Sequence, residues 1–446
     1  MLTKEQNELL CRIEGDAPMG QLARRHWLPV CLAEEVPERD GKPMRARLLG
    51  EDLVVFRDSN NRLGVLGEHC LHRRASLVFG RNEDCGLRCL YHGWKFDVEG
   101  NVVDMPSEAP GAAERLGKKT KAYPAREGGG FIWVWMGPRE KAERDPQGQR
   151  EFEPPAWAPK PGIKYAIVKM HAACNWAQVL EGSIDSAHSS SLHSTNMPAA
   201  EVEGSTATGS AWLRPSTDKA PRLQFEATSY GFRYAAIRKP IRNPETHQYV
   251  RSTLYIAPFT CLIPPNDQYN LAQMLIPIDD VNTMFYWIAW HPDPEKGISQ
   301  EAWRKFCAAT VGVDLDSEYR KIRNLQNGYR QDREAMQRGD WTGIEGIPTQ
   351  DMAMWESMGP ITDRSQDHPG SSDLAVAQFR RLMVAAAKKV QEGGPALGTE
   401  GWNSEPRIPH VQLASFEGVV PNTTDWRTLG MPSATPDRTE GALAGS

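Results

Sequence analysis

The sequence lacks the features that would place a protein in a membrane or on a nucleic acid. No apolar run approaches the length of about eighteen residues that a membrane-spanning helix needs, and the first residues are too charged for a signal peptide. Lysine and arginine total 52 against 57 acidic residues, and the net charge of −5 provides no strongly basic surface. We therefore expect a soluble, cytoplasmic protein that binds neither a membrane nor a nucleic acid.

Cysteine is scarce as well, and no glycine-rich nucleotide-binding motif is present. Eight cysteines are scattered over 446 residues, whereas disulfide-dense proteins are short and secreted. Most of these thiols are expected to be reduced and buried. The glycine triple at 128–130 precedes a predicted strand, whereas a dinucleotide fingerprint links a strand to a helix. Any flavin or nicotinamide must therefore be carried by another protein.

The composition, with 40% hydrophobic and 24% charged residues, is that of a globular protein whose length allows two or three domains. Hydrophobic periodicity predicts an α+β fold. The expected parts are a helical segment at 1–36, a small antiparallel β domain at 37–160, an α+β domain with a large antiparallel sheet covered by helices at 161–392, and an extended, partly flexible tail at 393–446. A polar, proline-rich stretch at 137–162 marks a linker or a surface excursion. Strands are expected at 223–238, 249–263, 269–277 and 283–291, and helices at 299–310, 317–338 and 371–392.

Two cysteine–histidine pairs form the most informative motif of the chain. Cys70 and His72 make up the first pair, and Cys89 and His92 make up the second after an interval of sixteen residues. Two thiolates and two imidazoles suit a Rieske [2Fe–2S] cluster, in which the cysteines hold one iron and the histidines hold the other. Such a cluster passes single electrons, so the motif predicts a redox protein with an electron acceptor elsewhere.

The rival interpretation of these four residues is a tetrahedral zinc site, which Cys₂His₂ sets also form. Zinc motifs usually place like ligands together, whereas each half of this motif carries one cysteine and one histidine. The mixed order favours the Rieske cluster. His69 and Cys85 lie near the motif but do not fit its spacing, so we assign both to loop or core positions.

A second set of polar residues follows on a predicted helix that starts at Asn175. Glu181, Asp185 and His188 are spaced four and three residues apart, which places them on one face of a helix. His193 follows five residues later, so the helix must end or distort between the two histidines. Two histidines and one distant carboxylate would form the facial triad that holds Fe(II) with open positions in non-haem oxygenases. The alternative is a pair of structural histidines that hold no metal.

Together the two motifs resemble those of the oxygenase components of Rieske non-haem iron oxygenases, and the resemblance covers nearly the whole chain except its tail. Within that family the sequence is most similar to the phthalate 4,5-dioxygenases, through the stretches 180–193, 212–222 and 358–367. The resemblance identifies 37–160 as the Rieske domain and 161–392 as the domain of a mononuclear iron. The implied cofactors are a [2Fe–2S] cluster on the two pairs and an Fe(II) held in part by His188 and His193.

The resemblance also assigns roles to two acidic residues. The family places the third iron ligand at the start of a helix, which corresponds to Asp351 in this sequence. Asp185 is expected to bridge His188 of one subunit to His92 or His72 of its neighbour, so that electrons cross between subunits. Four other downstream acids remain candidates for the third iron ligand, although each is more simply explained as a solvated or helix-capping acid. They are Asp340, Glu345, Glu356 and Asp363.

The same resemblance implies cis-dihydroxylation of an aromatic ring, in which O2, two electrons and two protons are consumed and a benzene dicarboxylate such as phthalate is the substrate. Arginine matches a carboxylate through two parallel hydrogen bonds. The expected substrate-binding residues are Arg214 and Arg251, with Ser186 as a hydroxyl donor. Arg238 and Arg242 are weaker candidates.

Electrons are expected from a separate NADH-dependent reductase that carries FMN and a plant-type [2Fe–2S] cluster, and the chain is expected to assemble as a trimer or as stacked trimers. The alternatives within the family act on isophthalate, terephthalate or a substituted benzoate, or remove a methyl group as aromatic O-demethylases. An electron carrier without an oxygenase site is a different class, against which His188, His193 and Asp351 argue. Asn175 suits either a place near the iron or a structural hydrogen bond.

Overall fold

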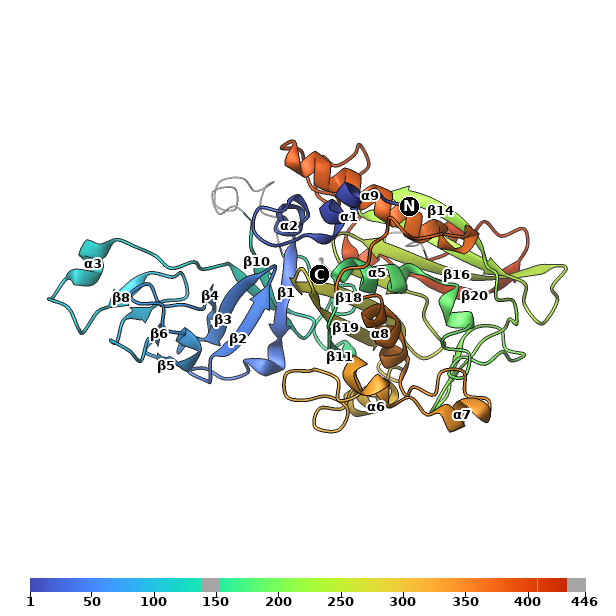
Figure 1. Ribbon diagram of the computed structural model, residues 1–446, viewed down its shortest axis with the longest axis horizontal. Coiled ribbons are helices and arrows are strands. Elements are labelled where there is room, and N and C mark those ends of the chain that lie inside the picture. The colour runs from blue at the N-terminus through green and yellow to red at the C-terminus, as the bar shows by residue number, and fades with distance from the viewer. Residues whose placement is uncertain (138–151, 407, 431–446) are drawn as a thin grey trace, which may run out of the picture.

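A small β domain and a larger α+β domain make up the computed structural model, which describes residues 1–137, 152–406 and 408–430. The small domain extends to one side of the large one in Figure 1. The predicted α+β class is confirmed, including the order of the two domains. Most of the predicted linker at 137–162 and the end of the tail lie outside the described residues.

The N-terminal helices pack on the large domain instead of the small one. Helix α1 (Lys4–Cys11) begins at a capping box in which Thr3 and Gln6 satisfy each other's backbone N–H groups. It is followed by α2 (Pro18–Ala23). Both helices contact α9 (Leu374–Gln391), which lies near the other end of the chain. The first residues thus cover part of α9, and Asn7 of α1 also donates to the carbonyl of Thr362, which is 355 residues away in the sequence and precedes α9.

The small domain is built from short antiparallel strands with a hydrophobic core of their own. One sheet has the order β2–β3–β4, another β1–β10–β9 and a third β5–β6–β7–β8. The bounds are β1 (Trp27–Leu32), β2 (Met44–Leu48), β3 (Glu51–Arg57), β4 (Leu63–Gly67), β5 (Arg81–Glu83), β6 (Gly86–Arg88), β7 (Lys95–Phe96), β8 (Val102–Asp104), β9 (Ala125–Gly128) and β10 (Phe131–Trp135), with α3 (Ala112–Leu116) after β8. Cys70 and Cys89 belong to this core, so both are held by packing.

The large domain is organised around an antiparallel sheet of order β11–β19–β18–β17–β16–β15–β14. The predicted strands at 223–238 and 249–263 are each a hairpin of two strands. Gly231 has φ +150° at the first of these turns, and a Cβ there would come within 2.4 Å of the Tyr255 carbonyl oxygen. The bounds are β11 (Lys164–Ala172), β14 (Arg222–Thr228), β15 (Gly231–Arg238), β16 (His247–Ile256), β17 (Thr260–Ile263), β18 (Asn270–Asp279) and β19 (Asn282–His291), with the short hairpin β12 (Thr206–Ala207) and β13 (Trp212–Leu213) outside the sheet.

The tail is only partly the extended surface segment that we expected. Residues Phe416–Pro421 form strand β20, which pairs with the first half of β16. Glu417 is thereby opposite Arg251 in the ladder. Strand β16 pairs with β15 along one edge, and its other edge pairs with β20 over the first half and with β17 over the second. Part of the tail is therefore a structural element of the large domain.

Helices cover the sheet, although one predicted helix is wrong. Helix α5 (Trp176–Ile184) packs on β17, β18 and β19, while α6 (Gln300–Phe306) packs on β11 and α8 (Ile347–Ser357) lies against α5. The stretch 317–338 holds only a 3-10 segment at Leu325–Arg330 and the short helix α7 (Arg333–Gln337). Gly328 and Tyr329 take positive φ angles of 59° and 55°, which interrupt a helix there.

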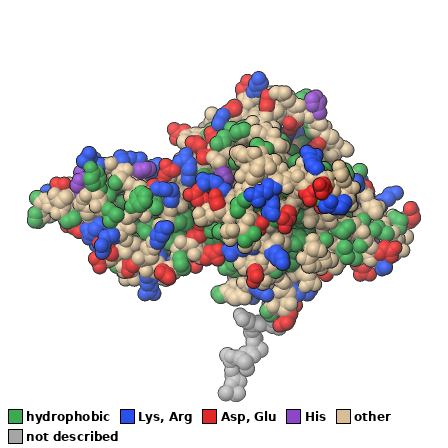
Figure 2. Space-filling view, turned by 60° about the horizontal axis from the view of Figure 1, so that its bottom comes forward, with side chains coloured by type: hydrophobic (Ala, Val, Ile, Leu, Met, Phe, Trp, Pro, Cys, Tyr) green, Lys and Arg blue, Asp and Glu red, His purple; other side chains and the backbone are tan. Residues whose placement is uncertain are grey.

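The described helices include no membrane-spanning element, and the face of the molecule drawn in Figure 2 carries charges of both signs. None of the described helices is both long and apolar enough to cross a membrane. On the face drawn in Figure 2, positively and negatively charged side chains are interspersed. This distribution agrees with the near balance of 52 basic and 57 acidic residues.

Candidate active site

The two cysteine–histidine pairs lie on two tight loops of the small domain. The first loop follows β4 and is closed by hydrogen bonds from the Cys70 N–H to the Ala75 carbonyl (2.9 Å) and from the Arg74 N–H to the Cys70 carbonyl (3.0 Å). The second lies between β6 and β7, where the Gly93 N–H donates to the Cys89 carbonyl at 3.0 Å. Gly93 has φ +79°, and a Cβ there would lie 2.5 Å from the ring of Pro106. Both loops are thus fixed by the backbone.

The side chains of the two loops converge in a way that fits a metal cluster. The rings of His72 and His92 have centroids 4.4 Å apart, and His72 stacks on Trp94 at 4.8 Å. The His72 Nδ1 atom is buried without a hydrogen-bond partner in the described structure, as an iron ligand would be before it receives the metal. Burial raises the pKa of the Cys70 thiol to about 11, and the adjacent thiol of Cys89 adds to the rise. A metal bound between the two sulfur atoms would favour their ionised form, because coordinated thiols are deprotonated.

These four side chains do not form a compact single-ion site of the kind that zinc occupies. Zinc lies about 2.0–2.3 Å from each nitrogen and sulfur ligand, so its four ligand atoms would all lie close together. Among the described residues, one group of three such side chains has its ligand atoms within 4.8 Å of one another, and the two pairs do not belong to it. His69 pairs through its backbone with Ser76, and Cys85 accepts a hydrogen bond from Asn60 in a turn.

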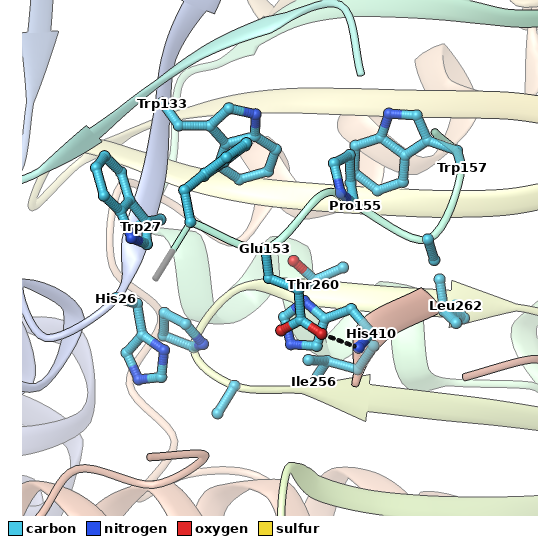
Figure 3. Close-up of a pocket in the computed structure, with 14 residues that line it drawn as sticks. His26, Trp27, Trp133, Glu153, Pro155, Trp157, Ile256, Thr260, Leu262 and His410 are labelled. Atoms are coloured by element: carbon cyan, nitrogen blue, oxygen red, sulfur yellow. Dashed lines mark hydrogen bonds between the residues drawn. The ribbon is translucent and has the colours of Figure 1, made fainter. Parts of the chain in front are cut away.

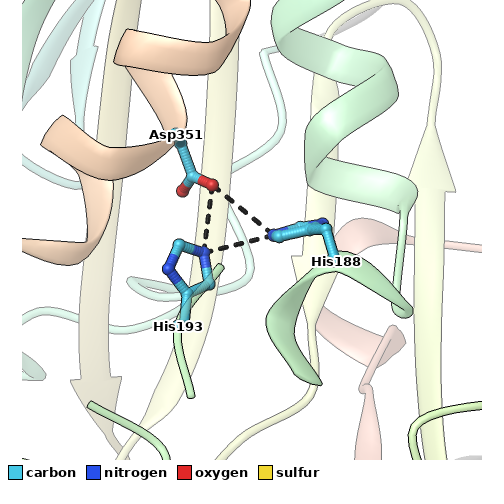
Figure 4. Close-up of side chains that lie close together, drawn as sticks. All are labelled: His188, His193 and Asp351. Carbon is cyan, nitrogen blue, oxygen red and sulfur yellow. Dashed lines mark hydrogen bonds and ion pairs between the residues drawn. The ribbon is translucent and has the colours of Figure 1, made fainter. Parts of the chain in front are cut away.

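A second converging set lies in the large domain, where His188, His193 and Asp351 meet (Figure 4). The Nε2 atoms of the two histidines are 3.2 Å apart. Asp351 Oδ1 lies 3.0 Å from His193 Nε2 and 3.5 Å from His188 Nε2. Two imidazole nitrogens and a carboxylate oxygen on one side of a point are the donor set of a facial triad. The three residues that the sequence suggested are therefore brought together.

Helix α5 positions the first histidine by ending early. Asn175 caps this helix by accepting from the Ala177 N–H (3.0 Å), and its amide donates to the carbonyls of Cys11 and Asp280 at 2.9 and 2.7 Å. Its role is thus structural. The helix ends at Ile184, so the expected shared helical face of Glu181, Asp185 and His188 is wrong.

The two triad histidines lie in short segments after α5, whereas Asp351 lies on helix α8. His188 lies in a 3-10 turn (His188–Ser190) and His193 in the loop beyond it. Glu181 points elsewhere and accepts hydrogen bonds from Arg364 (2.7 Å) and Arg380 (2.8 Å). Asp351 lies in the second turn of α8, slightly further into the helix than the sequence suggested.

Hydrogen bonds to the outer ring nitrogens orient both triad histidines. His188 Nδ1 lies 3.4 Å from Asp185 Oδ2, and His193 Nδ1 lies 2.8 Å from Gln350 Oε1. Burial would lower the pKa of His188, but the carboxylates of Asp185 and Asp351 outweigh burial and raise it. Since Nδ1 is the donor in each ring, both Nε2 atoms are left free for a metal.

Gln350 is a functional candidate that the sequence reasoning missed. Its amide N–H₂ donates to Asn196 Oδ1 (2.9 Å) and to the Ile344 carbonyl (2.8 Å), which fixes Oε1 toward His193. The side chain is 2% exposed. Its place next to Asp351 in the sequence was the one available signal, because neighbours of a metal ligand often support another ligand.

The other acids that the sequence offered as candidates for the third iron ligand have different partners. Asp340 accepts from the N–H groups of Thr342 and Gly343, and Glu345 pairs with Arg323. Glu356 accepts from Lys321 at 2.8 Å and from Tyr329, while Asp363 caps Ser365. Each therefore has a structural role at a distance from the two histidines.

A cavity adjoins the triad, and both apolar and polar side chains line it. Met197, Trp212, Ile263, Ile347 and Trp355 line it. Its polar lining residues include the triad itself and the following five: Asp185, Ser186, Arg251, Thr253 and Gln273. A cavity of this kind accepts an apolar ring and leaves a few polar groups to orient it.

Three buried arginines and one carboxylate lie behind and beside this cavity. Arg251 lines it, and its Nε is buried without a partner in the described structure. Arg238 donates to the Ser186 carbonyl at 2.6 Å but leaves Nε and Nη1 unpaired. Arg214 does not line the cavity, and its three nitrogens donate to Met197 and Ser189 at 3.0–3.3 Å.

The charge of this cluster follows from its pKa values. Burial lowers the pKa of Arg214 and of Arg238 to about 10, so both stay protonated at neutral pH. Burial also raises the pKa of Glu417, while Arg251 opposes the rise. Arg242, by contrast, is exposed and pairs with Glu201 at 3.2 Å. The three guanidinium groups outnumber the one carboxylate, so the cluster is positively charged in either protonation state of Glu417.

A second cavity lies where the small domain meets the large sheet (Figure 3). Trp27, Trp133 and Trp157 line it together with Glu153 and His410, and the Glu153 carboxylate accepts from the His410 backbone N–H at 2.8 Å. It shares no lining residue with the cavity at the triad.

The comparisons with known proteins agree with both metal centres. A Rieske [2Fe-2S] domain model matches residues 26–124, and a model described as LigXa C-terminal domain like matches residues 134–443. The chain is 57% identical to the phthalate 4,5-dioxygenase oxygenase subunit of Pseudomonas putida, over 96% of this chain and 94% of the relative. It is 33% identical to the 3-chlorobenzoate-3,4-dioxygenase oxygenase subunit of Comamonas testosteroni, over 96% and 97%.

More distant similarities support the fold. The 5,5'-dehydrodivanillate O-demethylase oxygenase subunit of a Sphingobium species is 30% identical over 88% of this chain and 82% of its own length. A solved structure of NdmA from Pseudomonas putida CBB5 with theobromine has a TM-score of 0.56 at 17% identity, covering 84% of this chain and 94% of that chain. At that identity the structural match concerns the fold alone.

Proposed function

This chain belongs to the Rieske non-haem iron oxygenases as an oxygenase subunit, and on that premise we propose that it cis-dihydroxylates a benzene dicarboxylate, phthalate at its 4,5-positions. The observation that carries the substrate class is the buried arginine cluster beside the triad cavity. Three guanidinium groups against one carboxylate give this cluster a net positive charge, which favours an anionic substrate such as a benzene dicarboxylate. Burying an unbalanced charge is costly, so a dianion suits this site better than a neutral ring does.

Arg251 is the proposed primary contact of the substrate, with Ser186 beside it as a hydroxyl donor. Arg251 lines the cavity and has an unpaired Nε, so its fork is available to a carboxylate. Arg238 lies behind Ser186, whose carbonyl it binds, and also has unpaired N–H groups. The N–H groups of Arg214 already donate to the loop after His188. We therefore propose that Arg214 contributes a positive electrostatic potential and holds this loop in place.

The resident cofactors are a Rieske [2Fe–2S] cluster and a mononuclear iron. When bound, they supply single-electron transfer and the activation of dioxygen, and one ring, one O2, two electrons and two protons give one cis-dihydrodiol. The proposed cluster ligands are Cys70, His72, Cys89 and His92. The proposed iron ligands are His188, His193 and Asp351. Asp185 and Gln350 hold the two imidazoles with Nε2 inward, and the apolar walls exclude water from the ring.

An electron-donating reductase or ferredoxin, dioxygen and an aromatic substrate are the partners that this family requires. We propose an NADH-dependent reductase with FMN and a plant-type cluster, and a trimer or stacked trimers of this chain. Leu90 and Tyr91, beside His92, are 61% and 56% exposed. Exposed apolar side chains around cluster ligands suit a contact with another subunit. In such an assembly, Asp185 would bridge His188 to a cluster histidine of the neighbour.

Product analysis tests the proposal directly. Purified chain, loaded with both metals and supplied with NADH and a reductase of the stated type, should convert phthalate to its 4,5-cis-dihydrodiol with one O2 consumed per ring. Arg251→Ala should weaken anaerobic phthalate binding at least tenfold, because the buried carboxylate loses a charged partner, and should keep both metals. The matched control is Arg242→Ala, which removes an exposed arginine. Release of formaldehyde from a methoxylated ring would instead indicate O-demethylation, the activity named for one relative.

A further inference from the structure

The carboxylate of Glu417 belongs to the arginine cluster, although Glu417 lies on β20 near the end of the chain. In the ladder between β20 and β16, Glu417 is directly opposite Arg251, so both side chains leave the sheet on the same face. Glu417 Oε2 accepts a hydrogen bond from the Ser205 N–H. Its Oε1 atom is buried and has no hydrogen-bond partner among the described residues. One of the two carboxylate oxygens is therefore left without a direct contact.

The protonation of Glu417 depends on the groups that face it. Burial raises the pKa of this carboxyl above its ordinary value of 4.5, and Arg251, Tyr249 and Arg214 oppose the rise. Tyr249 lies two residues before Arg251 on β16 and so on the same face. The Tyr249 hydroxyl makes no hydrogen bond of ordinary geometry in the described structure, yet it is near enough to affect the pKa of Glu417. Any further charge in this cluster must therefore shift the same equilibrium.

Arg251 connects Glu417 to the triad cavity. The guanidinium group that favours an ionised Glu417 also lines the cavity, where its Nε has no partner in the described part of the chain. A ligand carboxylate bound at Arg251 would add a second negative charge that draws on the same cation. A nearby negative charge raises the pKa of a carboxyl, and the sign of this effect does not depend on the distance. Ligand binding and protonation of Glu417 therefore favour each other.

We propose that Glu417 is a specificity-determining residue that reads the charge of the ligand: its ionised carboxylate opposes a dicarboxylate bound at Arg251, and its protonated form accepts one. On binding, a proton moves from solvent to a Glu417 oxygen, so an O–H bond forms and nothing is oxidised or reduced. The unpartnered Oε1 atom offers a place for this proton, and the unpartnered Tyr249 hydroxyl is a nearby acceptor. The inference rests on the proposed function, because that function supplies the anionic ligand at Arg251.

Calorimetric titration of the metal-loaded wild type under anaerobic conditions measures this link. Titrations in two buffers of different ionisation enthalpy should show that phthalate binding takes up a measurable fraction of a proton. Because the protonated form binds better, the affinity for phthalate should fall about fivefold as the pH rises from about 6 to about 8.5. The matched ligand is 2-nitrobenzoate, in which an uncharged nitro group of similar shape replaces one carboxylate. It should show a smaller proton uptake and a smaller fall in affinity.

Glu417→Gln keeps the size of the side chain and imitates the protonated form. At about pH 8.5 this variant should bind phthalate about fivefold more tightly than the wild type, and across the pH range its affinity should change less than about twofold. Glu417→Asp keeps the charge and should retain the pH dependence. The matched control is Glu203→Gln, an exposed residue whose carbonyl accepts from the Val419 N–H of β20. It should behave as the wild type does, and the ionisation of phthalate itself is common to all four proteins.

The outcomes separate this role from the function on which it rests. Phthalate binding without proton uptake would overturn the role of Glu417, as would a pH dependence that survives in Glu417→Gln. Cluster absorbance and iron content report whether that variant folds. If it does not fold, the wild type decides, because an equal proton uptake with phthalate and 2-nitrobenzoate would also overturn the role. Failure of the wild type to bind phthalate at any pH would instead refute the proposed function.

Discussion

At the scale of single residues, the two triad histidines differ in the partner that orients them. Asp185 holds His188 through a carboxylate, and Gln350 holds His193 through a neutral amide. An imidazole that is hydrogen-bonded to a carboxylate is a stronger metal ligand than one that is hydrogen-bonded to an amide, because the carboxylate favours positive charge on the ring. The amide in turn has both of its N–H₂ donors engaged. His193 is thus held mainly by geometry, and His188 by geometry and charge.

Gln350→Leu should therefore weaken retention of the mononuclear iron without affecting the cluster. Loss of a hydrogen bond to a metal-bound histidine typically costs about 10–100-fold in metal affinity. Iron content after dialysis against a chelator measures the loss, with the visible absorbance of the cluster as an internal standard. Gln366→Leu, an exposed glutamine exchanged in the same way, should leave the iron in place. Equal retention in both variants would show that Gln350 does not support the site.

Asp351→Ala should remove the mononuclear iron and keep the colour of the cluster. The carboxylate oxygen is 3.0 Å from His193 Nε2, and two imidazoles alone hold Fe(II) poorly because hard carboxylate donors are lost. Metal analysis should fall from three irons per chain to about two, as a Rieske cluster alone contains. Asp340→Ala, which alters a turn instead, should keep all three. Full iron in Asp351→Ala would move the third ligand to another acid.

Much of the site could be predicted from the sequence because its ligands are close in the chain or have distinctive spacing. The cysteine–histidine pairs and His188 with His193 fall within segments of a few residues each. Gln350 and Glu417 could not be predicted, since their roles depend on contacts across 157 residues in the first case and on the pairing of β20 with β16 in the second. The substrate-binding arginines were chosen by residue type alone. Residue type does not tell which of their N–H groups remain without a hydrogen-bond partner in the folded protein.

At the scale of secondary structure, buried charges join helices that are distant in sequence. Glu181 of α5 accepts from Arg380 of α9 and from Arg364, while Arg364 also donates to Asn7 of α1 at 3.0 Å. Burial would raise the pKa of Glu181, but Arg364 and Arg380 outweigh it and lower the pKa below the ordinary value of 4.5. The ionised form of Glu181 is thus more stable in the folded protein than in the unfolded chain.

The stability that Glu181 contributes should be lost in acid. Because the folded pKa is lowered, the contribution is complete above pH 4.5 and disappears as the pH falls through the lowered value. Glu181→Gln should cost about 3–5 kcal/mol at neutral pH, since Arg364 loses its carboxylate partner and Arg380 keeps only Asp367. The difference in melting temperature between wild type and variant should shrink below pH 4.5. Glu334→Gln, at an exposed position of α7, should have little effect at any pH. A constant difference across the acid range would contradict the assignment.

The helices and strands themselves could be predicted where the apolar period was strong, as for α9 at 374–391. Residues 317–338 contain good helix formers but lack an apolar stripe, and Gly328 with Tyr329 turns the backbone instead. The strand β20 escaped prediction because the tail is rich in polar residues and its partner β16 lies far away in the sequence. Tertiary pairing decides such segments.

At the scale of the whole molecule, the cluster and the iron site lie in different domains, and the proposed electron route runs between subunits. Asp185→Asn should keep both metals and lose nearly all turnover, because an amide cannot carry the charge that links His188 to a neighbour. Iron content, the cluster spectrum and NADH-coupled product formation measure the three properties. Near-normal turnover would refute the bridge.

Mixed assemblies test the same route without changing Asp185. Cys89→Ser should abolish the cluster, and Asp351→Ala should abolish the iron site, so each variant alone should be inactive. Co-expressed and purified together through two different tags, they should regain a measurable fraction of wild-type turnover, because a cluster in one subunit then serves an iron in another. Assemblies that stay inactive while containing both intact centres would place the route within one subunit.

The pairing of β20 with β16 also has a consequence for how the protein is made. Phe416 donates its N–H to the side chain of Ser252, 164 positions earlier, so this contact forms only after nearly the whole chain has left the ribosome. Until then, Arg214, Arg238 and Arg251 lack the carboxylate of Glu417, which β20 carries. Late closure of non-local strand pairs is slow, and the newly made chain must wait for its last segment before the pocket acquires its final charge. A chain shortened before Phe416 would retain the small domain and both metal motifs, yet would never complete the site that selects the ring.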